Sequence, residues 1–512
     1  MVFSSQVFVF IFLPLVFIVN TAVMAAGKGR KGFVKASNRL LLISSLIFYS
    51  WGEPLAVLLL VFEALFCFAM ALLIGKKPKL RKLWVALCCV LVLGVLCFFK
   101  YTGFLAGLIG TAAGVPAIGD TFKSLALPLG ISFFSFQLLS YVIDVYRGTT
   151  EPCRNYFRML LYTSFFPQLV AGPIVKYKDI AAQFEDRLFD PVGAAKGARR
   201  FVTGLAKKLL IANTVALIAD AVFDAAPETV TGGAAILGAV CYMLQIYFDF
   251  SGYSDMAIGM GRMFGFTINE NFKHPYASLS VREFWRRWHI SLSSWFRDYL
   301  YIPLGGNRKG RFRTVLNKLT VFFLTGLWHG AGFTFILWGL WHGLLLLIEE
   351  YAGAAFGAVR SRVKSKKGKD RADAPADPFL KAIAGFFRLV YVLAAVLLGF
   401  VMFRSDSVAH GFTIIGRMFS NTWELPAAVQ VNLTPFMMFA MAAGVLASMP
   451  WAEWAGKLSE KDRFKGAADF FAKEKVKTAV LAVSMVLTLA LFAACVLSLA
   501  SSAYNPFIYF RF

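Results

Sequence analysis

Long apolar stretches separated by short basic clusters make up most of the chain. The first stretch runs from about Val7 to Met24. That is long enough for a helix that crosses a bilayer, which takes roughly 20 residues. Basic residues follow between Lys28 and Lys35, and Met1 to Ser4 lack the positive charge of a signal peptide. The pattern therefore predicts an uncleaved first membrane helix.

Basic clusters that all face the cytoplasm must be separated by an even number of membrane crossings. Leu40 to Gly75 has the length of two spans, and Gly52-Glu53-Pro54 predicts the turn between them. Leu83 to Phe99 and Leu125 to Val145 predict two more. The clusters that set this register are Lys28–Arg39, Lys76–Lys82, Arg147–Arg158, Arg308–Lys318 and Arg360–Arg371.

Three further spans are expected at about Ala382 to Phe403, Leu433 to Pro450 and Thr478 to Leu499. The total is about eleven transmembrane helices, with re-entrant or interfacial helices in addition, and both termini are expected outside the cytoplasm. Residues 1–512 then form one membrane-embedded domain. Its sections are N-terminal helices at 1–150, a core at 151–350, a basic cytoplasmic linker at 351–381 and C-terminal helices at 382–512.

Composition supports this all-α polytopic membrane protein. Hydrophobic residues make up 58% of the chain and charged residues 16%, whereas a soluble domain is nearer half apolar and a quarter charged. The formal net charge is +24. Because most of this excess lies in short loops between apolar stretches, it indicates contact with membrane lipids rather than with nucleic acid. The seven cysteines include no CxxC spacing, which argues against a disulfide framework or a zinc site.

The middle of the chain, from Phe165 to Trp341, departs from the simple pattern. Its apolar runs are short, carry arginine, aspartate and histidine, and are interrupted at Gly172-Pro173, Gly252 and Leu304-Gly305-Gly306. Irregular backbone at membrane depth persists only where protein buries it or water reaches it. This region therefore predicts a thick, funnel-like core.

Two of the five histidines stand in settings that suggest chemistry, and the first is His289. If residues 282–292 form a single helix, Arg282, Arg286 and His289 share one face. Glu283 would then pair with Arg286 or Arg287 on another face. A plainer interpretation stays open, in which this segment is an amphipathic interfacial helix whose arginines extend to the headgroups.

The second is His329, inside the apolar run from Leu319 to Leu347. Basic clusters bracket this run, so it predicts a helical hairpin, and Gly326, Gly330 and Gly332 predict that the helix opens at the histidine. An ionisable residue at membrane depth is costly and is a candidate functional residue. The alternative is a neutral histidine bonded to a backbone carbonyl.

The other histidines and the buried carboxylates are weaker candidates. His342 is interpreted as a packing residue, and His274 and His410 as loop residues. The histidines lack the close spacing of a metal site, and no carboxylate is an obvious partner, so no metal is expected. Asp249 and Asp255 are expected to pair with arginine or tyrosine groups of the core.

Two histidines and an arginine face around a polar membrane cavity leave two kinds of chemistry open. A neutral histidine can take the proton of a hydroxyl group that attacks an activated carbonyl. Arginines can hold an anionic carrier or stabilise an oxyanion, so these groups suit acyl transfer. The same residues fit proton-coupled transport. The sequence contains no P-loop, nucleophile elbow or dinucleotide fingerprint.

Several segments together resemble the membrane-bound O-acyltransferase family, in the branch of the alginate O-acetylase membrane subunit. They occur in family-like order over most of the chain. The matching pieces are Phe166–Ile174, Tyr247–Asp255, Glu283–Leu292, Trp295–Asn307, Gly326–Ala331 and Tyr509–Phe512.

The resemblance implies a ring of transmembrane helices around a thin central floor. It implies that His329 is the catalytic residue and that His289 is its partner on the other side of the site. A thioester donor, acetyl-CoA or an acyl carrier protein, would arrive from the cytoplasm, the acceptor would be reached from outside, and no bound cofactor is expected. Weaker candidates for contacts with donor or substrate are Arg286, Arg287, Trp328, Asp249 and Asp255.

Relatives in this branch O-acetylate exported polysaccharides such as alginate or peptidoglycan, usually with a separate extracytoplasmic partner protein. The resemblance thus implies an O-acetyltransferase of a cell-surface polysaccharide in the bacterial cytoplasmic (inner) membrane. One alternative is D-alanyl transfer to teichoic acid from a cytoplasmic carrier protein, as in a sister group. Another is a proton-coupled exporter, which predicts an internal repeat that the sequence does not show.

Overall fold

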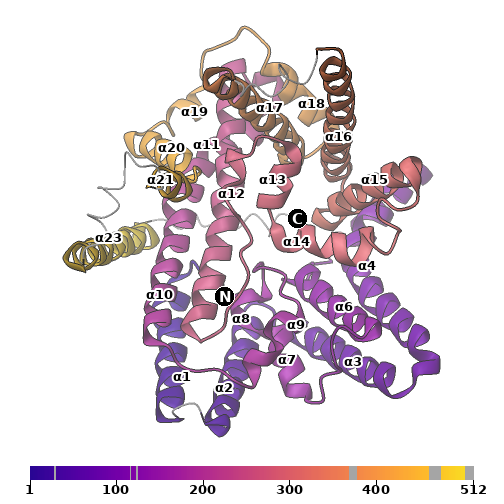
Figure 1. The fold of residues 1–512 in the computed structure, drawn as a ribbon, viewed down its shortest axis with the longest axis vertical. Coiled ribbons are helices and arrows are strands. Elements are labelled where there is room, and N and C mark those ends of the chain that lie inside the picture. Colours follow the sequence, from indigo (N-terminus) through magenta and orange to yellow (C-terminus); the bar gives the residue numbers. More distant parts are fainter. Residues whose placement is uncertain (28–29, 116, 123–124, 368–376, 460–473, 502–512) are drawn as a thin grey trace. The chain divides into compact units, whose positions relative to one another are not determined.

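The computed structural model describes residues 1–512 except 28–29, 116, 123–124, 368–376, 460–473 and 502–512. The described part of the chain is helical and contains no strand (Figure 1). The matching piece Tyr509–Phe512 and the middle of the expected basic linker lie outside the described residues. The chain divides into two compact units, each made of separate stretches. Unit 1 is Met1–Asn213, Ile246–Asn271 and Ala479–Phe512, and unit 2 is Thr214–Gln245 and Phe272–Thr478.

Unit 1 contains the N-terminal helices together with the second part of α12 and most of the last described helix. Its helices are α1 (Leu13–Gly27), α2 (Lys31–Ser50), α3 (Ala56–Lys76), α4 (Arg81–Ala113), α5 (Ala117–Phe122), α6 (Ile131–Arg147), α7 (Tyr156–Ser164), α8 (Phe166–Leu169), α9 (Tyr177–Ile180), α10 (Pro191–Ala206), α12 (Gly232–Met263) and α23 (Glu474–Ser501). Short 3-10 or π segments are η1 (Phe8–Phe12), η2 (Pro78–Leu80), η3 (Ala181–Phe184) and η4 (Lys207–Ala212).

Unit 2 contains the segments that carry both conspicuous histidines. Its helices are α11 (Asn213–Phe223), the first part of α12, α13 (Val281–Arg287), α14 (Ile290–Phe296), α15 (Gly310–His329), α16 (Phe333–Lys367), α17 (Pro378–Arg404), α18 (Val408–Arg417), α19 (Ala427–Gln430), α20 (Pro435–Ala447) and α21 (Trp451–Ser459). Short segments are η5 (Pro227–Thr229), η6 (Pro275–Ala277) and η7 (Arg297–Tyr301).

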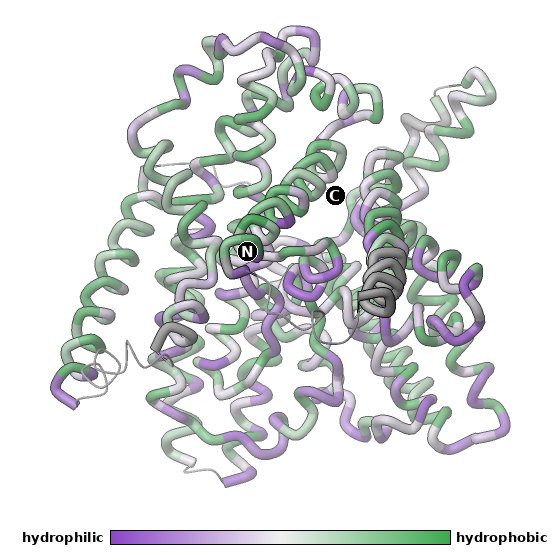
Figure 2. The backbone as a smooth tube through the Cα atoms, turned by 45° about the horizontal axis from the view of Figure 1, so that its top comes forward, coloured by the Kyte–Doolittle hydropathy of each residue, from purple (hydrophilic) through white to green (hydrophobic). Residues whose placement is uncertain are grey.

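Within the described residues, eight helices are long and apolar enough to cross a membrane. Figure 2 shows apolar or neutral positions over most of the backbone and hydrophilic positions in short segments. These observations confirm a polytopic, all-helical membrane protein. The spans are Phe8–Gly27, Ala56–Lys76, Pro78–Ala113, Pro191–Phe223, Gly232–Met263, Phe333–Ala354, Phe379–Arg404 and Glu474–Ser501.

The count of eight is below the expected total of about eleven. α6 has 17 residues and α20 has 13, which is short for a span. α2 and α15 are long enough, but each carries several basic residues in its first half. The total number of crossings therefore stays a prediction.

Two predicted hairpin turns occur where the sequence placed them. α2 ends at Ser50 and α3 begins at Ala56, so the connection contains Gly52-Glu53-Pro54. α15 ends at His329 and α16 begins at Phe333. α4, which has 33 residues in all, covers the span expected from Leu83 to Phe99 and continues to Ala113.

Gly252 does not interrupt a helix, so that part of the sequence interpretation is wrong. α12 continues through Gly252 without a break. The apolar runs of this region are also longer than expected, because Pro191–Phe223 and Gly232–Met263 are each long enough to span a membrane. The glycine instead permits close packing, because a Cβ atom at Gly252 would lie 2.7 Å from the carbonyl oxygen of Gly204 on α10. Gly197 and Gly259 meet in the same way, at 2.6 Å. Small residues at such positions allow membrane helices to approach backbone to backbone.

Buried phenylalanines form the core of unit 1. The Phe8 ring lies 5.0 Å from that of Phe3, 5.7 Å from Phe48 and 6.2 Å from Phe166. All four side chains are fully or almost fully buried. Such ring pairs add to the stabilisation from burial, so a segment near residue 166 is fixed against the first two helices.

Candidate active site

The start of α13 is fixed by three polar groups. The hydroxyl of Ser280 accepts a hydrogen bond from the backbone N–H of Glu283 at 3.0 Å, and the Glu283 carboxylate accepts one from the N–H of Leu279 at 2.9 Å. This arrangement is close to a capping box. The Glu349 carboxylate of α16 accepts from the N–H of Val281 at 2.6 Å. A negative charge at a helix N-terminus is favourable, so α16 helps to orient α13.

α13 ends before His289, so the single helix expected over residues 282–292 is wrong. The N–H of Lys273 donates to the carbonyl of Arg287 at 2.9 Å, and His289 has a φ of +42°, in the left-handed region. α14 begins one residue later. Arg282 and Arg286 are exposed, whereas His289 is fully buried. The two arginines therefore do not share a face with the histidine.

His289 lies among aromatic rings. Its ring stacks on Phe272 at 6.4 Å and meets Trp328 edge-on at 5.9 Å. Burial lowers the pKa of His289 to about 3, because surroundings of low polarity disfavour the charged ring. The imidazole is therefore neutral at physiological pH, with one nitrogen able to accept a proton or a hydrogen bond.

His329 is the last residue of α15. The next residue has extended backbone, which confirms that the helix opens at this histidine. The side chain is 6% exposed and meets Trp338 at 5.0 Å and Phe403 at 5.3 Å. α15 and α16 pack closely here, because a Cβ atom at Gly326 would lie 2.3 Å from the carbonyl oxygen of Phe335. The helical hairpin predicted for this region is therefore tightly packed beside the histidine.

Trp328 contacts both candidate histidines. Its indole meets the ring of His329 at 4.9 Å and that of His289 at 5.9 Å, edge-on in both cases. His342 joins the same cluster through Trp338, which lies 5.2 Å from it. Over the described residues, no group of three or more histidine, cysteine, aspartate or glutamate side chains is placed to hold a metal ion.

The two remaining histidines lie elsewhere in unit 2. His274 is in a loop, as expected, with a φ of +47°. His410 is in the first turn of α18 rather than in a loop, and its N–H donates to the hydroxyl of Ser407 at 3.1 Å. Ser407 is the N-cap residue of α18, and its hydrogen bond explains why the helix begins before His410.

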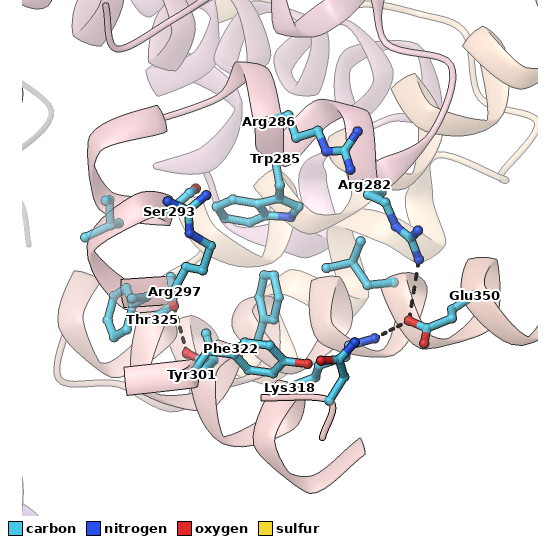
Figure 3. Close-up of a pocket in the computed structure, with 15 residues that line it drawn as sticks. Arg282, Trp285, Arg286, Ser293, Arg297, Tyr301, Lys318, Phe322, Thr325 and Glu350 are labelled. Atoms are coloured by element: carbon cyan, nitrogen blue, oxygen red, sulfur yellow. Dashed lines mark hydrogen bonds and ion pairs between the residues drawn. The ribbon is translucent and has the colours of Figure 1, made fainter. Parts of the chain in front are cut away.

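A pocket of about 630 Å³ adjoins the histidine cluster, because Trp285 lines it and also contacts His342. Figure 3 shows basic side chains around the Trp285 indole. Glu350 is a lining carboxylate, and it pairs with Arg282 at 3.4 Å and with Lys318. The basic lining residues are Arg282, Arg286, Arg297 and Lys318. Arg297 also pairs with Asp298 at 2.8 Å. Four cations against these two carboxylates still leave an excess of positive charge, which suits an anionic ligand.

Arg286 and Arg287 lie differently. Arg286 is exposed and lines the pocket. Arg287 pairs with Glu283 at 2.8 Å and donates to the carbonyl of Lys273 at 3.3 Å. Arg286 can therefore contact a ligand in the pocket, whereas Arg287 holds α13 to the loop that precedes it.

Sequence reasoning missed Arg297, Lys318 and Glu350 as pocket residues. Lys318 was interpreted only as part of a topology-setting basic cluster. A helical signal was present, because Lys318, Thr325 and His329 are spaced by seven and four residues, which places them on one face of α15. Lys318 and Thr325 line the pocket.

Asp249 and Asp255 form ion pairs within unit 1. Asp249 lies 2.8 Å from the ammonium of Lys208, and the two side chains are 2% and 3% exposed. Asp255 lies 2.8 Å from Arg200 and 2.6 Å from Lys207. The arginine partner was expected, whereas the two lysines were not. These contacts give both aspartates a role in joining α12 to α10 and η4.

Comparison with known proteins identifies the family of this chain. Residues 153–364, which include both candidate histidines, match the membrane-bound O-acyltransferase family. The chain is 37% identical to the probable alginate O-acetylase AlgI of Pseudomonas putida over 535 residues, 100% of each chain. It is also 37% identical to the peptidoglycan O-acetyltransferase of Helicobacter pylori over 371 residues, 66% of this chain and 68% of that protein.

A more distant similarity is to the teichoic acid D-alanyltransferase of Bacillus subtilis, at 28% identity over 223 residues, 40% of this chain and 53% of that protein. The chain belongs to the membrane-bound O-acyltransferase family. It is a membrane-embedded acyltransferase.

Proposed function

We propose that this chain O-acetylates an exported cell-surface polysaccharide, either directly or by passing the acetyl group to an extracytoplasmic partner protein. Support comes from its full-length similarity to a probable alginate O-acetylase and its similarity to a peptidoglycan O-acetyltransferase. The observation that carries the proposal is the contact of Trp328 with two buried histidines, His289 and His329, in a cluster that adjoins a basic pocket.

His329 serves as the general base. Its imidazole takes the proton of the acceptor hydroxyl while that oxygen attacks the carbonyl carbon of the thioester. The carbon–sulfur bond then breaks, and the thiolate takes a proton back from the imidazolium and leaves as a thiol. His289, which contacts Trp328 and is neutral because burial lowers its pKa, assists by a hydrogen bond to the reacting groups.

The donor is acetyl-CoA or an acetylated carrier protein. Both present a thioester on a pantetheine arm that ends in phosphate. Arg286, Arg297 and Lys318 in the pocket suit this phosphate, since cations form strong hydrogen bonds to phosphate oxygens. The pocket faces the cytoplasm in this proposal, and the acceptor is reached from outside the bacterial inner membrane.

The decisive experiment identifies the ester that depends on His329. A deletion strain would be complemented with wild type, His329→Ala or the control His410→Ala, and protein levels would be compared in membranes. Surface polysaccharide would be treated with mild base, and the released acid identified. We expect acetate from wild type and from the control, and an amount of acetate at least about 10²-fold lower from His329→Ala.

Wild-type acetate levels in the His329→Ala strain would contradict the mechanism. Release of D-alanine in place of acetate would contradict the proposed substrate and favour teichoic acid D-alanylation. The absence of any histidine-dependent ester would contradict acyl transfer to a surface polymer.

The donor pocket is tested by removing one charge. Arg286→Gln should raise the KM for the donor about tenfold, the effect of losing roughly 1.4 kcal/mol of binding free energy. The matched control is Arg313→Gln, which removes an exposed arginine of α15 that does not line the pocket. Equal KM values for Arg286→Gln and wild type would contradict binding of the donor phosphate in this pocket.

A further inference from the structure

His342 lies on α16, deep in the aromatic cluster, and is 0% exposed. Its ring meets Trp338 at 5.2 Å and Trp285 at 5.3 Å, both edge-on, and stacks on Phe284 at 6.1 Å. Neither of its ring nitrogens has a hydrogen-bond partner among the residues that the structure describes. The side chain is thus a polar group held in an apolar, aromatic enclosure.

A purely structural role explains this arrangement poorly. A neutral imidazole always presents one N–H donor and one acceptor nitrogen. Leaving a buried donor or acceptor unsatisfied costs about 1–3 kcal/mol. A phenylalanine would fill the same space, stack on the same rings and avoid this cost. The nitrogens of His342 are therefore best explained by a partner that is a ligand.

The surrounding backbone makes room for the histidine. On α17, a Cβ atom at Gly399 would lie 3.1 Å from Nε2 of His342 and 3.2 Å from Cδ1 of Trp341. Both distances are shorter than ordinary van der Waals contact. The absence of a side chain at Gly399 is what allows the imidazole to occupy this position.

Further polar atoms gather at the same place. The indole N–H groups of Trp285 and Trp338 are also buried without a hydrogen-bond partner within the described part of the chain. Trp285 lines the basic pocket, as Figure 3 shows, and contacts His342 as well. The rings of Trp285 and Trp338, which both contact His342, therefore carry two further donor groups without a partner among the described residues.

We propose that His342 binds the acyl donor, by a hydrogen bond to an amide group of its pantetheine arm. The arm carries amides at a distance from its phosphate, and an amide offers both a donor and an acceptor. With the phosphate at the arginines of the pocket, the arm passes Trp285, whose side chain turns aside, and its amide meets His342. This inference rests on the proposed function, because it assumes a pantetheine thioester as donor.

The test compares binding of coenzyme A to full-length protein in lipid nanodiscs by calorimetry. The variants are His342→Phe, which keeps an aromatic ring but removes both nitrogens, and His342→Gln, which restores a donor and an acceptor. His410→Phe is the control, because His410 lies on α18 outside the cluster. Thermal unfolding of each variant would be measured in parallel.

We expect His342→Phe to weaken coenzyme A binding about tenfold while its unfolding temperature equals or exceeds that of wild type. His342→Gln should recover part of the affinity, and the control should bind like wild type. Unchanged affinity in His342→Phe would overturn the proposal. If His342→Phe does not fold, affinity in His342→Gln equal to that of an alanine variant would overturn it. Wild-type protein that transfers acetate neither from acetyl-CoA nor from an acetylated carrier protein would contradict the proposed function instead.

Discussion

Two buried polar clusters in this membrane protein are built in opposite ways. In unit 1, Lys208 and Asp249 form an ion pair with both side chains almost fully buried. In unit 2, His289 and His329 lie among aromatic rings. Burial is similar in both, but only the first cluster consists of paired charges.

The difference separates stability from chemistry. Each charge of the ion pair compensates the other, so removing one partner leaves an uncompensated charge in a membrane helix. The buried imidazole of His289, whose pKa is lowered by burial, is neutral and keeps a lone pair that can accept a hydrogen bond. Substitutions in unit 1 should therefore lower stability, and substitutions in the histidine cluster should lower activity.

The largest effect is expected for Lys208→Met. It leaves Asp249 buried without its cation, which costs about 3–5 kcal/mol. Thermal unfolding in detergent, monitored by the loss of the folded peak in size-exclusion chromatography, should show a strongly lowered midpoint temperature. The double variant Lys208→Met/Asp249→Leu should recover most of the loss, because it removes both charges. If the single variant unfolds at the wild-type temperature, the pair has no structural role and the comparison fails.

The next largest effect is expected for His289→Asn, which should change the rate of acetyl transfer rather than the free energy of unfolding. Asparagine adopts the left-handed backbone of this position, but its amide group has no basic nitrogen that could accept a proton. Acetyl transfer should fall about 10²-fold, with the unfolding midpoint close to wild type. The matched control is His274→Asn, which changes the other left-handed histidine, at φ +47°, outside the cluster. Equal transfer rates in the two variants would show that His289 has no part in the chemistry.

The smallest effect is a pH dependence of stability. The folded pKa of His289, about 3, lies below its ordinary value of 6.5, so only the unfolded chain takes up this proton as the pH falls below 6.5. The contribution of His289 to the free energy of unfolding is fully present above pH 6.5 and declines by about 1.4 kcal/mol per pH unit towards pH 3. Between pH values of about 7 and 5.5, the unfolding midpoint of wild type should fall more than that of His289→Asn. Parallel curves for the two proteins would mean that His289 is not held neutral by burial.

Much of the fold followed from local patterns. The turn at Gly52-Glu53-Pro54 and the hairpin that opens at His329 depend on glycine, proline and hydrophobic length, which act over a few residues. Gly252 was misread for the same reason. In sequence a glycine within an apolar run suggests a break, whereas its function here is a contact with Gly204, which lies far along the chain.

The candidate site was predicted in its residues more than in its geometry. The apolar periodicity of residues 282–292 continues through Trp288, so it gave no sign that α13 stops there. The stop depends on the hydrogen bond from Lys273 to Arg287 and on the left-handed conformation of His289. The lysine partners of Asp249 and Asp255 are more than forty residues away, and single-sequence patterns carry no information about such pairing.

The left-handed backbone of His289 limits what can replace it. Apart from glycine, residues adopt this conformation rarely, and asparagine and aspartate do so more easily than bulky or β-branched residues. If position 289 were fully randomised, selection for stable membrane expression alone would enrich asparagine and glycine, because a buried aspartate would carry an unpaired charge. Adding selection for ester formation would reduce the surviving codons to those for histidine. At this position the demands of the main chain and of the reaction overlap in a single amino acid.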